Sequence, residues 1–129
     1  MKKNVIAAVV FLFILTSSAF AGEKKWDTVK DETALRKIFI KKSNLKDPVS
    51  ILFRNVKVEI TSSEEQKKIN SYCGEVNFKN EYGAYIGFHK FVAIQEDGDP
   101  GTVAIAGKDP SLFQILAVDI CAGSGLELR

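Results

Sequence analysis

Residues 73–91 read CGEVNFKNEYGAYIGFHKF and hold most of the side chains that could do chemistry. The only histidine, His89, lies in this stretch together with Cys73, one of two cysteines. A thiolate beside an imidazole is a nucleophile–base pair, so one interpretation is a small cell-wall hydrolase using Cys73 and His89. With one histidine, the sequence does not support a zinc site. Asp97 and Asp99 lack the EF-hand spacing of a calcium loop, so we predict no metal site. The G-x-G-x-x-G spacing of dinucleotide sites is also missing, so we predict no cofactor.

In the same stretch we expect a turn over residues 80–83, and hydrogen-bonding and aromatic side chains gather around it. Such a group could recognise a polar or sugar-like ligand through hydrogen bonds and ring stacking. The structural alternative is a glycine-assisted hairpin with cross-strand aromatic pairs, in which Asn77 braces the turn. A recognition surface would leave the polar side chains partly exposed and bury Phe78 and Phe88. The candidate binding residues are Asn77, Lys79, Asn80, Tyr82 and Tyr85.

The N-terminus has the pattern of a secretory signal peptide. Lys2 and Lys3 precede an apolar run over residues 5–15, and Ala19-Phe20-Ala21 forms a small-residue cleavage site. That run is much shorter than the ~20 residues that span a bilayer, so we expect no stable membrane anchor. The sequence therefore predicts a signal peptide over residues 1–21 and a single mature domain over residues 22–129, periplasmic or secreted.

The charge of the mature chain is balanced. Two of the 18 basic residues leave with the signal peptide, so 16 basic residues face 16 acidic ones. A neutral balance gives no general argument for binding nucleic acid, and we expect no nucleic-acid partner.

Cys73 and Cys121 are the two cysteines of a chain predicted to be exported. An even count in an oxidising compartment predicts a disulfide, and this pairing would remove the nucleophile that the hydrolase interpretation needs. The bond would close a long loop, which is worth roughly 4 kcal/mol in the chain-entropy account.

Two segments have helical signals at the ends of the domain. Residues 28–45 place Ala34, Leu35, Ile38 and Phe39 on one stripe. Asp47-Pro48 ends that helix and starts a helical turn over residues 48–52, with Asp47 as its N-cap. At the C-terminus, Asp109 as N-cap and Pro110 at the first position predict a second helix. Residues 113–120 are apolar enough that a strand stays open as an alternative.

The middle of the chain alternates as strands do. We expect strands over residues 55–61, 72–79, 84–95 and 102–106, and a short polar helix over residues 63–70 after the capping box Ser-x-x-Glu. Because residues 84–95 are apolar on both faces, this strand must be covered on both sides. The predicted fold is α+β. It has an antiparallel sheet of about four strands, an N-terminal helix on one side and a disulfide-clamped C-terminal helix on the other.

Two motifs carry a resemblance to a known group of proteins. They are Asp47-Pro48-Val49-Ser50 running into Phe53-Arg54-Asn55-Val56, and Cys73-Gly74-Glu75-Val76-Asn77 followed by Lys79-Asn80, Gly83, Tyr85, Gly87-Phe88 and Phe91. Over roughly residues 45–92 the chain resembles a small family of uncharacterised exported proteins of Gram-negative bacteria and their phages. The resemblance implies export to a Gram-negative periplasm and assigns no catalytic residue.

These observations favour an exported, non-enzymatic binding or interaction protein of the inhibitor, immunity or envelope-associated type. The partner would be a periplasmic protein or a cell-wall component. The alternative is an enzyme, the small cell-wall hydrolase that would use Cys73 and His89. A third class, a small-ligand carrier, would need a cavity that a sequence does not reveal.

Overall fold

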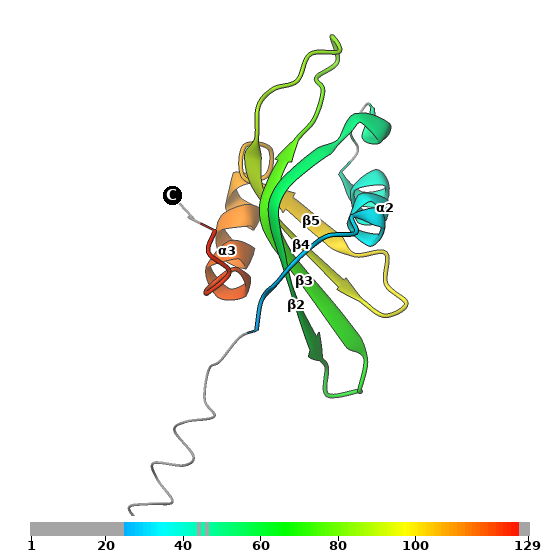
Figure 1. Cartoon of the computed structure of the whole chain (residues 1–129), viewed down its shortest axis with the longest axis vertical. Helices are drawn as coiled ribbons and strands as arrows, with labels where there is room; N and C mark the ends of the chain where they lie inside the picture. Colours follow the sequence, from blue (N-terminus) through cyan, green and yellow to red (C-terminus); the bar gives the residue numbers. More distant parts are fainter. Residues whose placement is uncertain (1–24, 44, 46, 127–129) are drawn as a thin grey trace, which may run out of the picture.

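The computed structural model describes residues 25–43, 45 and 47–126, which form one antiparallel sheet with a helix on each side (Figure 1). The predicted signal peptide and its cleavage site lie outside the described residues. The α+β architecture, the antiparallel sheet and the two terminal helices are confirmed.

The sheet has five strands in the order β1-β2-β3-β4-β5, each antiparallel to its neighbour. One strand more is present than the four predicted, because Asp27 and Thr28 pair with β2. Trp26, just before this added strand, packs partly buried against the cluster under the C-terminal helix. The strands are β1 (Asp27–Thr28), β2 (Leu52–Ser62), β3 (Lys68–Asn77), β4 (His89–Glu96) and β5 (Thr102–Ile105).

The helices are α2 (Thr33–Lys42), the 3₁₀ turn η1 (Pro48–Ser50) and α3 (Pro110–Ile120). The buried stripe of α2 is Leu35, Ile38 and Phe39, as predicted, whereas Ala34 is exposed. The predicted start at residue 28 is wrong because that residue belongs to β1. Helix, not strand, is found over the apolar C-terminal run.

Both aspartates predicted as N-caps make other hydrogen bonds. Neither Asp47 nor Asp109 caps its helix through its side chain. Asp47 instead accepts a hydrogen bond from the hydroxyl of Ser50 at 2.7 Å, and Asp109 accepts one from the N–H of Ile105 at 3.4 Å. Proline stands at the helix start in both cases, so the proline signal located these helices correctly.

The sheet separates two apolar layers. The layer under α2 is built around the edge-to-face rings of Phe39, Phe53 and Phe91, with centroids 5.1–5.8 Å apart. The layer under α3 contains the Cys73–Cys121 disulfide, which closes a loop of sequence separation 48 and confirms the predicted pairing. Both cysteines are buried, so the bond clamps α3 onto the centre of the sheet.

The short polar helix predicted over residues 63–70 is absent. A tight loop joins β2 and β3, in which the N–H of Ser63 donates to the carbonyl of Lys67 and the N–H of Gln66 to that of Ser63. The hydroxyl of Ser63 accepts from the N–H of Lys67 at 3.1 Å. An isolated short helix is unstable in water, whereas the two long strands continue their pairing up to Ser62 and Lys68. Strand pairing therefore overrides the capping-box signal.

Candidate functional site

Residues 78–88 leave the sheet and project beyond it as a long loop, at the top of Figure 1. The sequence predicted a strand from residue 84, but regular pairing with β3 starts only at His89. The loop remains a narrow hairpin, because Lys79 and Tyr85 form an isolated bridge and the N–H of Ile86 donates to the carbonyl of Phe78 at 3.2 Å.

The tip of this loop is the predicted turn around Asn80. The side-chain oxygen of Asn80 accepts hydrogen bonds from the N–H groups of Tyr82 at 2.9 Å and Ala84 at 3.1 Å. Gly83 takes a φ of +83°, which glycine adopts without strain. These hydrogen bonds hold the backbone of the turn in one conformation, while Tyr82 stays 87% exposed. Tyr82 is thus an aromatic ring displayed on a pre-organised support.

Asn77 lies at the base of the loop and is buried, with 9% of its surface exposed. Its side-chain oxygen accepts a hydrogen bond from the N–H of Gly87 at 3.0 Å, across the loop. A buried side chain cannot meet a partner directly, so the partial exposure expected of a recognition residue is not found. The geometry is that of the bracing alternative.

Lys79 and Tyr85 tie the loop to η1. The ammonium of Lys79 lies 5.4 Å from the ring centroid of Tyr85 and 4.0 Å from a carboxylate oxygen of Asp47. The hydroxyl of Tyr85 donates to the carbonyl of Ser50 at 2.9 Å. Of the five predicted binding residues, Asn77 braces the base of the loop and Asn80 shapes the turn. Lys79 and Tyr85 hold the loop against η1. Tyr82 is the one whose side chain is fully presented.

The two phenylalanines predicted to be buried differ in outcome. Phe78 is buried at 9% exposure, as expected, whereas Phe88 is partly exposed. The ring of Phe88 is covered by the guanidinium of Arg54, whose central carbon lies 4.0 Å from the ring centroid. This cation–π contact connects the loop to the end of β2.

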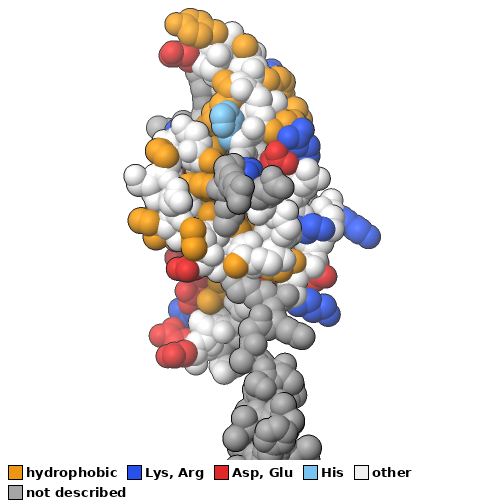
Figure 2. Space-filling view, turned by 90° about the vertical axis from the view of Figure 1, so that its left-hand side faces the viewer, with side chains coloured by type: hydrophobic (Ala, Val, Ile, Leu, Met, Phe, Trp, Pro, Cys, Tyr) orange, Lys and Arg blue, Asp and Glu red, His pale blue; other side chains and the backbone are white. Residues whose placement is uncertain are grey.

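A cavity of about 240 Å³, here called the socket, lies between the loop and the turn that joins β5 to α3. The ring of His89 has no hydrogen-bond partner in the part of the chain that the structure describes. Figure 2 shows this single histidine at the surface beside hydrophobic side chains. The socket residues are Phe78, Ile86, His89, Ile105, Gly107 and Lys108.

Cys73 and His89 lie on opposite faces of the sheet. Cys73 pairs with Val92 in the layer under α3, whereas His89 pairs with Val76, which belongs to the layer under α2. Side chains three positions apart on a strand point to opposite faces. The sulfur of Cys73 is also bonded to Cys121. The nucleophile–base pair that the sequence suggested is therefore not formed in this fold.

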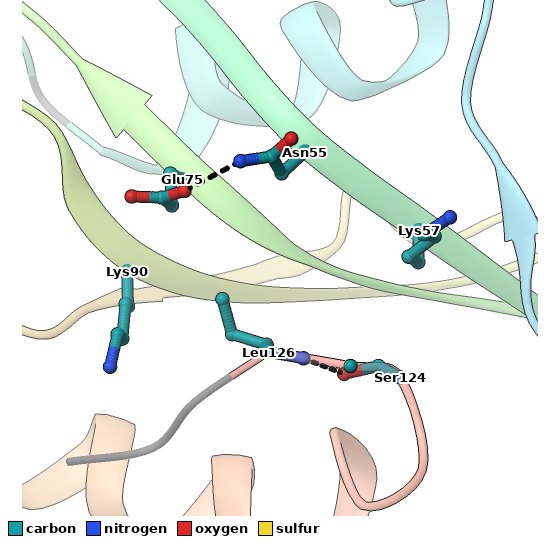
Figure 3. Close-up of a pocket in the computed structure, with 7 residues that line it drawn as sticks. Asn55, Lys57, Glu75, Lys90, Ser124 and Leu126 are labelled. Atoms are coloured by element: carbon teal, nitrogen blue, oxygen red, sulfur yellow. Dashed lines mark hydrogen bonds between the residues drawn. The ribbon is translucent and has the colours of Figure 1, made fainter.

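A second, polar pocket of about 420 Å³ lies between the sheet and the segment after α3 (Figure 3). A bulge between Arg54 and Lys57 interrupts the β2–β3 register there, and Asn55 in it has a φ of +55°, unusual for a residue with a side chain. In Figure 3 the amide of Asn55 points at Glu75. The pocket residues are Asn55, Lys57, Glu75, Lys90, Ser124, Gly125 and Leu126.

Glu75 is the electrostatic centre of this polar pocket. Its carboxylate accepts two hydrogen bonds from Arg54, at 2.8 and 3.3 Å, and one from Asn55 at 3.0 Å. These bonds favour the ionised form, so they hold the pKa of Glu75 below its ordinary value, and the same pair raises the pKa of Arg54. The carboxylate is occupied by its neighbours, which makes it a structural anion and not a free base.

The two motifs behind the family resemblance meet across β2 and β3. Arg54 pairs with Glu75 and Phe53 with Val76 in the strand register. Gly74 stands where a Cβ would lie 2.9 Å from the Cα of Val56, so the bulged strand can approach only a glycine. The motifs thus encode one bulge and the base of the projecting loop. The sequence offered no signal for their pairing, because cross-strand register is a tertiary property.

Comparison with protein-family models, with curated proteins and with solved structures found no match. Among the described residues, no helix has both the length and the apolar character needed to cross a membrane. Within the same residues, no group of three or more histidine, cysteine, aspartate or glutamate side chains could hold a metal ion.

Proposed function

We propose that this chain is an exported, non-enzymatic binding protein that engages a protein partner through the end of the molecule formed by the projecting loop and the socket. The observation that carries the proposal is the pairing of a displayed ring, Tyr82, with an apolar cavity that shares the same loop. Interfaces are dominated by a few aromatic anchors and by the pockets that receive such anchors.

The rigidity of the loop supports this assignment. A partner that binds a flexible loop must also order it, which costs affinity. Here the backbone of the tip is already held by Asn80, and the base by Asn77. Other large apolar side chains are exposed at this end, which adds contact area; they are Val49, Leu52 and Ile86, at 83%, 45% and 40% exposure.

Export is supported by the N-terminal pattern and by the disulfide, a bond that persists in oxidising compartments. We expect the exported protein to begin at Gly22 and to contain no free thiol. Intact mass after fractionation tests the first point, and alkylation of the denatured protein without reductant tests the second. A full-length chain retained in the membrane would contradict export, and a Cys73 that labels readily would contradict the disulfide.

The binding proposal is tested by photo-crosslinking in a Gram-negative periplasmic extract. A photoreactive amino acid replaces Tyr82 in one variant and Glu64 in the control; Glu64 is also exposed but belongs to the β2–β3 loop. We expect one discrete adduct from position 82 and none from position 64. The same adducts from both positions, or none from position 82, would refute binding through the loop end.

A further inference from the structure

We propose that the socket receives a tyrosine side chain of the partner, with its ring between the apolar walls and its hydroxyl hydrogen-bonded to His89. This inference rests on the proposed function and specifies the chemistry of the residue that binds. The inference comes from the cavity and from the imidazole of His89, to which no described residue forms a hydrogen bond, and not from the sequence patterns or the loop.

The size of the socket suits a single side chain better than a larger ligand. Its volume of about 240 Å³ is below the ~300–1,000 Å³ typical of pockets for drug-sized ligands. At ~30 Å³ per water molecule it would hold about eight waters, which is the scale of a single aromatic side chain.

The walls of the socket favour a ring. Phe78 and Ile105 belong to the buried cluster under α2, and Ile86 closes the socket from the loop side. Lys108 donates from its ammonium to the carbonyl of Ser43 at 2.6 Å. Its charge is therefore already engaged, and its aliphatic stem is what it offers to the cavity. An aromatic occupant could meet the ring of Phe78 edge to face.

His89 is the polar group that remains for an occupant. A neutral imidazole carries one donor and one acceptor nitrogen, and no described residue uses either. A phenol hydroxyl both donates and accepts, so it can satisfy either tautomer. A phenylalanine ring would leave the imidazole unpaired, and an indole could serve only the acceptor nitrogen. Tyrosine is thus the aromatic side chain that matches the site best.

Gly107 sets the width of the socket. A Cβ at this position would lie 2.8 Å from Nδ1 of His89 and 3.0 Å from its Cε1. Any side chain at position 107 would displace the imidazole or fill the space beside it. A Gly107→Val substitution therefore closes the socket from the side opposite the loop, without removing His89.

The test uses small analogues of side chains as probes. The mature protein, uniformly labelled for amide NMR, is titrated with p-cresol, which represents tyrosine, and with toluene, which represents phenylalanine. We expect p-cresol to shift the amides around Gly107 and Ile86. Since a hydrogen bond contributes about 0.5–1.5 kcal/mol, p-cresol should bind about 2–10-fold more tightly than toluene.

Four variants make the result specific. His89→Phe should bring the p-cresol to toluene ratio to about one, and Gly107→Val should abolish binding of both probes. Ile115→Ser, on the exposed face of α3, should leave the titration unchanged. The amide spectrum itself reports whether each variant is folded, and His89→Gln, which keeps a donor and an acceptor, should retain the preference if His89→Phe does not fold.

The outcomes separate this inference from the proposed function. Equal binding of the two probes, shifts confined to another surface, or no binding at all would overturn the tyrosine assignment. A crosslink from position 82 that persists in such a case would leave the loop end as a binding surface. Loss of that crosslink together with normal p-cresol binding would refute the proposed partner surface and leave a phenol-binding cavity.

Discussion

Replacing Asn77 by alanine should loosen the base of the projecting loop. The substitution removes the hydrogen bond from the N–H of Gly87 and leaves a small void at a position that is 9% exposed. Gly87 is itself exposed, so water can reach its N–H and the full cost of a buried unpaired donor does not apply. The lost hydrogen bond contributes about 0.5–1.5 kcal/mol, and a little packing is lost with it. We therefore expect Asn77→Ala to lower the free energy of unfolding by roughly 1–2 kcal/mol.

The assay compares Asn77→Ala with Lys79→Ala, a partly exposed neighbour on the same loop. At roughly 4–8 °C per kcal/mol for a domain near this size, Asn77→Ala should lower the Tm by about 4–15 °C. Lys79→Ala should change it by much less. Crosslinking from position 82, normalised to folded protein, should fall little in Asn77→Ala. An unchanged Tm with strongly reduced crosslinking would refute the bracing role and make Asn77 a contact residue.

Three further predictions concern the frame that holds the site. Replacing Cys73 and Cys121 by alanine should cost about 2–5 kcal/mol in urea unfolding, and an unchanged midpoint would show that α3 docks without the bond. Gly74→Ala should cost about 1–3 kcal/mol, because its Cβ meets the backbone of Val56; a stability within error of wild type would contradict that contact. The lowered pKa of Glu75 contributes stability that is present above its ordinary value of 4.5 and is lost as the pH falls through the lower folded value. Glu75→Gln should therefore make the free energy of unfolding fall less steeply at acid pH than in the wild type. A curve parallel to that of the wild type would show that the Arg54–Glu75 pair does not cause the loss of stability in acid.

Local patterns identified most elements because they depend on near neighbours along the chain. The stripe of α2, the prolines that begin η1 and α3, and the asparagine–glycine turn at Asn80 all appear where the sequence placed them. The cysteine count predicted the disulfide, and the two apolar faces of residues 84–95 predicted that the sheet is covered on both sides. The spacing of apolar and polar residues and the even number of cysteines are sufficient to predict such features.

Errors arose where a local signal competed with pairing to a distant segment. The capping box at residues 62–65 was overridden by the β2–β3 hairpin, and residues 84–88 left the sheet although they alternate like a strand. Asp47 and Asp109 are a separate case: each has the residue type of an N-cap, but its carboxylate accepts a hydrogen bond from a residue three or four positions away, Ser50 or Ile105. For the capping box, the β2–β3 ladder outweighed the local preference.

The sequence by itself determined the class of fold, the two helices that cover the sheet, the covalent clamp and the turn that carries Tyr82. These follow from periodicity, turn chemistry and cysteine count, which are properties of short segments. Only the tertiary structure decided that His89 and Cys73 face opposite ways, that Asn77 is a brace, and that a socket forms beside the loop. Those features depend on strand register and on the approach of residues 105–108 to the loop, and such distances along the chain leave no local pattern to read.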